Sequence, residues 1–166
     1  MLNIVLYQPE IPQNTGNIVR TCAALGCRLH LIRPLGYSLD SRYLKRAGLD
    51  YWDKADVAVY DDWWDFIGKN AIQRMFFLST KGERNYSQVE YEPGDYIVFG
   101  KESYGLPETL LEDNYERCLR IPMREGIRSL NLSNSVAIVA FEAFRQQGFA
   151  GLKEEGRLTG RQEAPL

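Results

Sequence analysis

The feature that most constrains the fold of this chain is the alternation of short apolar runs with helical patterns. Each run is bounded by turn residues and rich in Val, Ile, Leu, Phe or Tyr; the runs are Leu2–Tyr7, Leu29–Ile32, Val57–Tyr60, Met75–Leu78, Tyr96–Phe99 and Cys118–Ile121. Such runs are typical of strands buried on both faces of a sheet. Helix signals separate them, at 15–25, 40–49, 61–69, 107–113 and 133–147. The alternation predicts a three-layer α/β fold around a mainly parallel sheet.

This architecture also predicts where a ligand binds. In open α/β sheets, ligands lie beyond the carboxyl ends of the strands. We therefore expect the loops after Tyr7, Leu78, Phe99 and Ile121 to form the functional edge. The 166 residues suit one domain, which we place at 1–151. Residues 152–166 are polar and rich in glycine, and we expect a flexible tail there.

Charge and composition exclude some classes of protein. Twenty Lys and Arg against 22 Asp and Glu give a net charge of −2, so the chain is not a generally basic nucleic-acid coat. Residues 117–128 nevertheless carry Arg117, Arg120, Arg124 and Arg128 against Glu125 alone. A nearly neutral protein with one basic face can still bind a polyanion.

The cysteines and the single histidine argue against metal and disulfides. The three cysteines, Cys22, Cys27 and Cys118, form no C-x-x-C pair, and a structural zinc site needs about four nitrogen or sulfur ligands. His30 lies in an apolar run, where a buried structural histidine is favoured. We expect a cytoplasmic protein with reduced thiols and no metal. The sequence also shows neither a signal peptide nor an apolar stretch long enough to cross a membrane.

The last helical segment, 133–147, is apolar around nearly its whole circumference. A helix of this kind must be buried on all sides. One layer of sheet covers one side only, so either another helix or a second subunit covers the rest. The residues alone leave both alternatives open.

Three segments place glycine and polar residues at ends of predicted strands. Residues 14–20 (NTGNIVR) are either a capped helix start or part of a site. Residues 99–107 (FGKESYGLP) match neither a dinucleotide-binding nor a P-loop motif, and are either a tight turn or a place where a ligand approaches the backbone. Residues 121–135 (IPMREGIRSLNLSNS) hold more hydroxyl and amide groups than one helix cap requires, which favours a polar ligand beside an anion.

Together these segments resemble the three signature motifs of the SPOUT (SpoU–TrmD) RNA methyltransferases, in particular the SpoU-type branch that methylates ribose 2′-hydroxyls. Residues 2–20, 46–51 and 80–82 are similar to the minimal single-domain members, which modify nucleotide 34 of tRNA. The resemblance covers residues 1 to about 151. Lys101, Tyr104 and residues 124–127 depart from the residues that relatives often carry.

The resemblance implies a Rossmann-like sheet with a C-terminal trefoil knot and an obligate homodimer, which would cover the apolar last helix. S-adenosylmethionine, converted to S-adenosylhomocysteine without metal, would lie in the knot. The residues that would hold it are Leu78, Gly100, Ile121, Ser129 and Leu130.

The resemblance also implies the roles of polar residues. Arg20 would lie at the attacking hydroxyl, Asn14 and Asn131 would orient the ribose, and Glu102 would hold either Arg20 or the loop. The residues expected to contact RNA are Arg46, Arg124 and Arg128.

The expected reaction is methylation of the wobble nucleotide, C34 or U34, of tRNA, with leucine isoacceptors as the expected substrates. Two alternatives are a non-catalytic module that binds RNA or a nucleotide, and methylation of another RNA.

Overall fold

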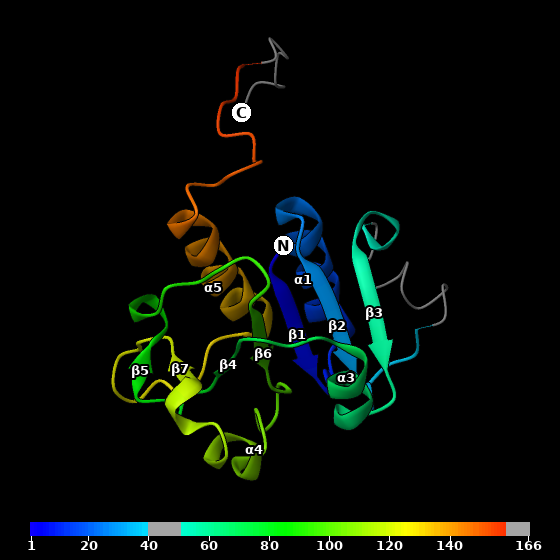
Figure 1. Ribbon diagram of the computed structural model, residues 1–166, viewed down its shortest axis with the longest axis vertical. Helices are drawn as coiled ribbons and strands as arrows, with labels where there is room; N and C mark the ends of the chain where they lie inside the picture. Colours follow the sequence, from blue (N-terminus) through cyan, green and yellow to red (C-terminus); the bar gives the residue numbers. More distant parts are fainter. Residues whose placement is uncertain (40–50, 159–166) are drawn as a thin grey trace, which may run out of the picture.

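The computed structural model describes residues 1–39 and 51–158. In this part of the chain, seven strands form one sheet in the order β3-β2-β1-β6-β4-β7-β5 (Figure 1). The strands are β1 (Asn3–Tyr7), β2 (Arg28–Ile32), β3 (Asp56–Tyr60), β4 (Met75–Leu78), β5 (Arg84–Asn85), β6 (Tyr96–Phe99) and β7 (Cys118–Arg120). Neighbouring strands are parallel, and Val5 of β1 pairs with His30 on one side and Val98 on the other.

The helices lie close to the predicted positions. They are α1 (Pro12–Leu25), α3 (Trp63–Lys69), α4 (Glu108–Glu112) and α5 (Leu132–Gln146), with short 3₁₀ turns at Trp52–Lys54, Tyr86–Gln88 and Tyr115–Arg117. The helix predicted at 40–49 falls outside the described residues. None of the described helices is long and apolar enough to cross a membrane.

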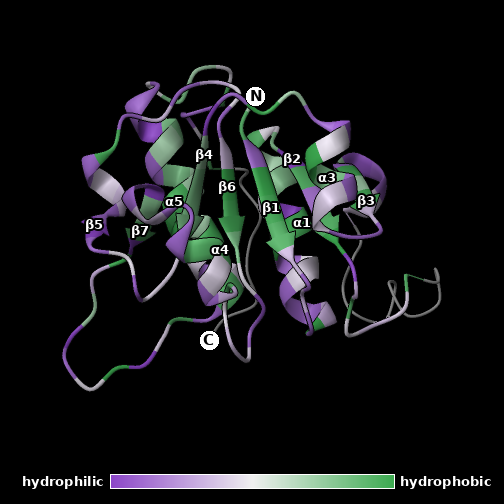
Figure 2. Ribbon diagram, turned by 60° about the horizontal axis from the view of Figure 1, so that its bottom comes forward, coloured by the Kyte–Doolittle hydropathy of each residue, from purple (hydrophilic) through white to green (hydrophobic). Residues whose placement is uncertain are grey.

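Side chains of successive strand residues point to opposite faces of the sheet and build two cores. Ile4 and Leu6 of β1 belong to the core on the side of α1 and α5, whereas Val5 belongs to the core on the side of α3 and α4. In Figure 2 the hydrophobic residues concentrate in the sheet and on the helix sides toward it. The predicted three-layer α/β fold is therefore confirmed.

Helix α5 is only partly covered by its own chain. Val136, Val139 and Ala140 are fully buried, and α5 packs beside α1. Ile138 and Phe141, however, are 36% and 48% exposed. The side of α5 that carries these two residues is thus left uncovered by the described residues.

His30 is a buried structural histidine, as predicted. It is fully buried, with Nδ1 2.8 Å from the hydroxyl oxygen of Tyr60 and Nε2 3.1 Å from Oδ1 of Asn3. An amide oxygen only accepts, so Nε2 carries the proton of the neutral ring. Burial, with a smaller contribution from Arg28, lowers the pKa of His30 from 6.5 to about 4.

This lowered pKa predicts a loss of stability in mild acid. Below pH 6.5 His30 becomes protonated in the unfolded chain, whereas in the folded chain it stays neutral until about pH 4. Protonation therefore favours the unfolded state, and the free energy of unfolding decreases as pH falls between these values. At pH 5 we expect a loss of about 2 kcal/mol relative to pH 7. Urea unfolding of the wild type and of His30→Gln at both pH values measures it. Equal losses in the two proteins would contradict the assignment.

Candidate active site

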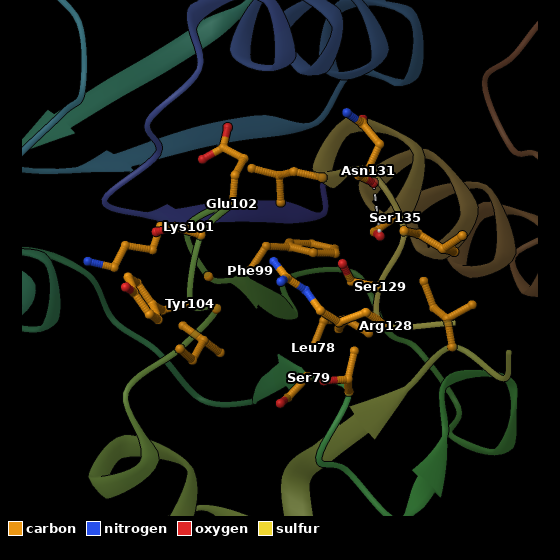
Figure 3. A pocket seen from close by; sticks show the side chains of 18 of the residues that line it. Leu78, Ser79, Phe99, Lys101, Glu102, Tyr104, Arg128, Ser129, Asn131 and Ser135 are labelled. Carbon is orange, nitrogen blue, oxygen red and sulfur yellow. Dashed lines mark hydrogen bonds between the residues drawn. The ribbon is translucent and has the colours of Figure 1, made fainter. Parts of the chain in front are cut away.

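A cavity of about 500 Å³ lies beyond the carboxyl ends of β4, β6 and β7 (Figure 3). Its walls come from the loops after Leu78, Phe99 and Ile121, and from Ile11 and Asn14 at the start of α1. These are the loops that the sequence placed at the functional edge. The volume is in the range of small-molecule sites.

Most of the predicted site residues meet in this cavity. Those that line it are Asn14, Leu78, Gly100, Glu102, Ile121, Arg128, Ser129, Leu130 and Asn131. Arg124 and Arg20 are not among the described residues that line it, and Arg46 lies outside the described residues. Arg20 is exposed, with its guanidinium carbon 4.7 Å from the centre of the Tyr51 ring.

A chain of hydrogen bonds joins the three sequence motifs. Asn14 Nδ2 donates to Glu102 Oε1 over 3.0 Å, and Asn131 Nδ2 donates to Asn14 Oδ1 over 3.0 Å. Asn131 also caps α5, because its Oδ1 accepts from the backbone N–H groups of Ser133 and Asn134. The N-cap of α1 is Ile11, so the capped-start alternative does not explain Asn14.

We call residues 101–105 the Lys101–Gly105 hairpin. Two carboxylates, one on each side, hold it against the segment between β1 and α1. Glu102 accepts from the backbone N–H of Glu10 at 2.8 Å and of Ile11 at 3.1 Å. Glu10 in turn accepts from Ser103, through the backbone N–H and Oγ, both at 2.9 Å. The bonds from Ser103, and then the charge of Lys101, lower the pKa of Glu10. Of the two expected roles of Glu102, these contacts match holding the loop.

Two glycines allow this hairpin for different reasons. Gly105 has a φ of 72°, in the left-handed region that favours glycine. At Gly100 the reason is space, because a Cβ atom there would lie 2.0 Å from the carbonyl carbon of Gly105 and 2.3 Å from the nitrogen of Leu106. The backbone at Gly100 thus packs directly against the backbone at the end of the hairpin, and only glycine fits there.

The opposite wall is fastened to β7. The N–H of Ser79 donates to the carbonyl oxygen of Leu119 over 2.9 Å, and Arg120 Nη1 donates to the carbonyl oxygen of Thr80 over 2.7 Å. Lys81 forms an ion pair with Glu108 of α4. Among residues 1–39 and 51–158, no group of three His, Cys, Asp or Glu side chains is placed to hold a metal ion.

Comparison with known proteins bears on this arrangement. The SpoU rRNA Methylase family model matches residues 1–141. The chain belongs to the SpoU methylase family. The resemblance drawn from the three motifs is thereby confirmed, and the motifs are the segments that the hydrogen-bond chain unites.

Relatives of this SpoU family protein include tRNA (cytidine(34)-2′-O)-methyltransferases. The one from Saccharophagus degradans is 52% identical over 154 residues, covering 92% of this chain and all of the relative. A solved structure described as "Structural insights into the 2-OH methylation of C/U34 on tRNA" is 50% identical, with a TM-score of 0.82, and covers 89% of this chain and 91% of its own.

A more distant family member bears on the cofactor. The rRNA methyltransferase from Sinorhizobium meliloti, solved with AdoMet bound, is 26% identical with a TM-score of 0.75. The match covers 87% of this SpoU family protein and 56% of the other chain. AdoMet, or S-adenosylmethionine, is thus used by a relative with the same fold.

Some residues of the site were not predicted. Glu10 lies in the loop between β1 and α1, and its place in a loop after a strand was the only signal that could have indicated it. Lys101 and Tyr104 were noted as departures from relatives without a role, and both line the cavity.

Proposed function

We propose that this SpoU family protein transfers a methyl group from S-adenosylmethionine to the 2′-hydroxyl of nucleotide 34, a cytidine or uridine, of tRNA. The observation that carries the proposal is the single cavity in which Glu102, Asn14 and Asn131 join the three motifs. Relatives about 50% identical over nearly their whole length, named for this reaction, support it.

The cavity suits a nucleoside-containing cofactor. Leu78, Ile121 and Leu130 supply apolar surface for an adenine ring, while Gly100 lets the hairpin backbone pack closely enough to shape this wall. Ser129 supplies a polar group for the ribose or amino-acid part of the cofactor. The walls thus combine apolar surface with polar groups that can fix the orientation of a ligand, as cofactor sites do.

The chemistry requires alignment more than activation. S-adenosylmethionine supplies a methyl group already activated by positively charged sulfur. The chain must therefore orient the ribose hydroxyl and assist the loss of its proton. Asn131 donates a hydrogen bond to Asn14, which donates in turn to Glu102, so both amides are fixed and can orient the ribose of the RNA substrate. Arg128, which also lines the cavity, can pair with an RNA phosphate.

Arg20 is proposed to act at the attacking ribose hydroxyl of an RNA bound at the cavity of the other subunit of a homodimer. An arginine keeps its proton, so it would stabilise the developing alkoxide, directly or through an RNA phosphate, rather than act as the base; the proton of the hydroxyl would pass to a phosphate or to water. Because Arg20 of the described chain is exposed and does not line the cavity of its own chain, it would have to reach a second copy. The uncovered side of α5, with Ile138 and Phe141, supplies an apolar surface for that copy.

Phe141→Asp is expected to disrupt this dimer. The substitution would place an unpaired charge in an apolar contact, which costs several kcal/mol. Light scattering should show a monomer of unchanged fold. Trp64→Asp is the control, because Trp64 is a 77% exposed aromatic on α3, at the opposite face of the sheet. A stable Phe141→Asp dimer would contradict the proposed interface. Val139 would not serve this test, because it is buried in its own chain.

The finer expectations accompany this proposal. Residues 1–151 would be one catalytic domain with 152–166 as a tail, the segment after β7 would form the trefoil knot, and leucine tRNAs in the cytoplasm would be the substrates.

Nucleoside mapping tests the reaction. Mass spectrometry of tRNA from cells with and without the gene, and of transcripts treated with purified protein, should show 2′-O-methylation at nucleotide 34 only where the protein is present. Binding of tRNA without methylation would favour the non-catalytic module. A methylated nucleotide in another RNA, with none at position 34, would replace the proposed substrate.

A further inference from the structure

A large aromatic side chain stands unshielded at the mouth of the cavity. Tyr104 is 84% exposed, although it lines the cavity together with buried Leu106. In Figure 3, Tyr104 and Lys101 lie side by side on one flank of the cavity, and Arg128 and Ser129 lie on the opposite flank. Packing within the chain does not account for a ring so fully exposed.

The backbone that carries this ring is rigidly held. Gly105 N–H donates to the carbonyl oxygen of Lys101 over 2.9 Å and closes the hairpin. The reciprocal bonds of Glu10 with Ser103 and of Glu102 with the β1 end fasten the residues before Tyr104. A ligand that stacks on Tyr104 would therefore not have to order the loop first, which lowers the cost of binding.

The charges around the ring suit a nucleotide. Lys101 Nζ lies 5.7 Å from the centre of the Tyr104 ring, and Arg128 lies across the cavity. The neighbouring carboxylates of Glu10 and Glu102 are both occupied by hydrogen bonds from the chain. The Lys101 ammonium lies over one face of the ring, so the other face is free to stack with a base. Lys101 and Arg128 can pair with the phosphates of the same strand.

We propose that Tyr104 is a stacking platform for a base of the RNA substrate, either the base of the methylated nucleotide or that of an immediate neighbour. The inference rests on the proposed function, because it takes the RNA strand to pass over this cavity. Tyr104 thereby positions the substrate rather than taking part in methyl transfer. Its ring, not its hydroxyl, makes the contact.

The test combines removal of the Tyr104 ring with removal of single bases from the RNA. Single-turnover rates at subsaturating RNA are measured for the wild type and Tyr104→Ala, with intact tRNA and with transcripts abasic at nucleotide 33, 34 or 35. Stacking on an aromatic ring predicts that Tyr104→Ala is about tenfold to 100-fold slower on intact tRNA. On one abasic transcript the two proteins should become equal. Tyr104→Phe should retain most of the rate.

The control variant is Trp64→Ala, which removes another exposed aromatic, remote from the cavity, and should match the wild type on every transcript. The affinity of Tyr104→Ala for S-adenosylhomocysteine, measured by calorimetry, should be unchanged. A loss that is the same on all transcripts, no loss on intact tRNA, or a parallel loss of cofactor affinity would overturn the inference. Failure of the wild type to methylate intact tRNA would instead refute the proposed function.

Discussion

Arg20→Ala is expected to slow methyl transfer by about 10²–10³-fold in single-turnover experiments at saturating tRNA. Removing one preorganised group that stabilises transition-state charge typically has an effect of this size. The affinity for S-adenosylhomocysteine should remain unchanged, because Arg20 does not line the cavity of its own chain. Arg20→Lys should recover little, since an ammonium group does not reproduce the planar fork of a guanidinium.

Arg124→Ala separates catalysis from RNA binding. Arg124 is exposed and does not line the cavity, so its loss should weaken tRNA binding and leave the saturated rate intact. The slope of log affinity against log salt should flatten by about 0.7–0.9 for one lost phosphate contact. If Arg20→Ala gives this pattern instead, Arg20 is an RNA anchor and its catalytic assignment is wrong.

Gly100→Ala is expected to lower cofactor affinity at least about 100-fold, or roughly 3 kcal/mol, the upper range for overpacking a rigid site. The new Cβ would meet backbone atoms of Gly105 and Leu106, so the hairpin and with it Glu102 must move. Calorimetry with S-adenosylhomocysteine measures the loss. Gly68→Ala is the matched control, because a Cβ at that position of α3 meets nothing within 4 Å. Unchanged affinity in Gly100→Ala would show that the hairpin does not shape the cofactor site.

The two variants together test whether the partner subunit supplies Arg20. If the protein forms the proposed homodimer, co-expression of differently tagged Arg20→Ala and Gly100→Ala chains gives mixed dimers. If Arg20 acts across the interface, one cavity of each mixed dimer combines an intact Gly100 with the partner subunit's Arg20, and activity returns. If Arg20 acts within its own chain, both cavities remain defective and the mixed dimers stay inactive.

Strand positions could be predicted because both faces of this parallel sheet are buried, which leaves continuous apolar runs in the sequence. The β5 strand has only the two residues Arg84 and Asn85, too few to give such a run. Helix α1 begins at Pro12 rather than Thr15, because proline fits the first turn of a helix, where its missing N–H is not needed.

The site was predictable only where residues lie at strand ends. Glu10 and Ser103 are 93 positions apart, so their reciprocal bonds become visible only in the folded chain. Arg20 illustrates a second limit. It follows Asn14 by six residues, which turns it roughly 240° around the helix. The sequence showed that Arg20 belongs to the motif, but it did not show that Arg20 lies away from the cavity that Asn14 lines.

The hydrogen bonds between the three motifs have a consequence for folding during synthesis. Asn14 meets Glu102, 88 positions later, and Asn131, 117 positions later. Contacts of such sequence separation form late and slow the folding of a domain. Since the chain leaves the ribosome N-terminus first, Asn14 at the start of α1 has neither partner for most of synthesis. The hydrogen-bonded cavity is thus complete only when the final helix docks, so an incomplete chain would lack the proposed site of methyl transfer.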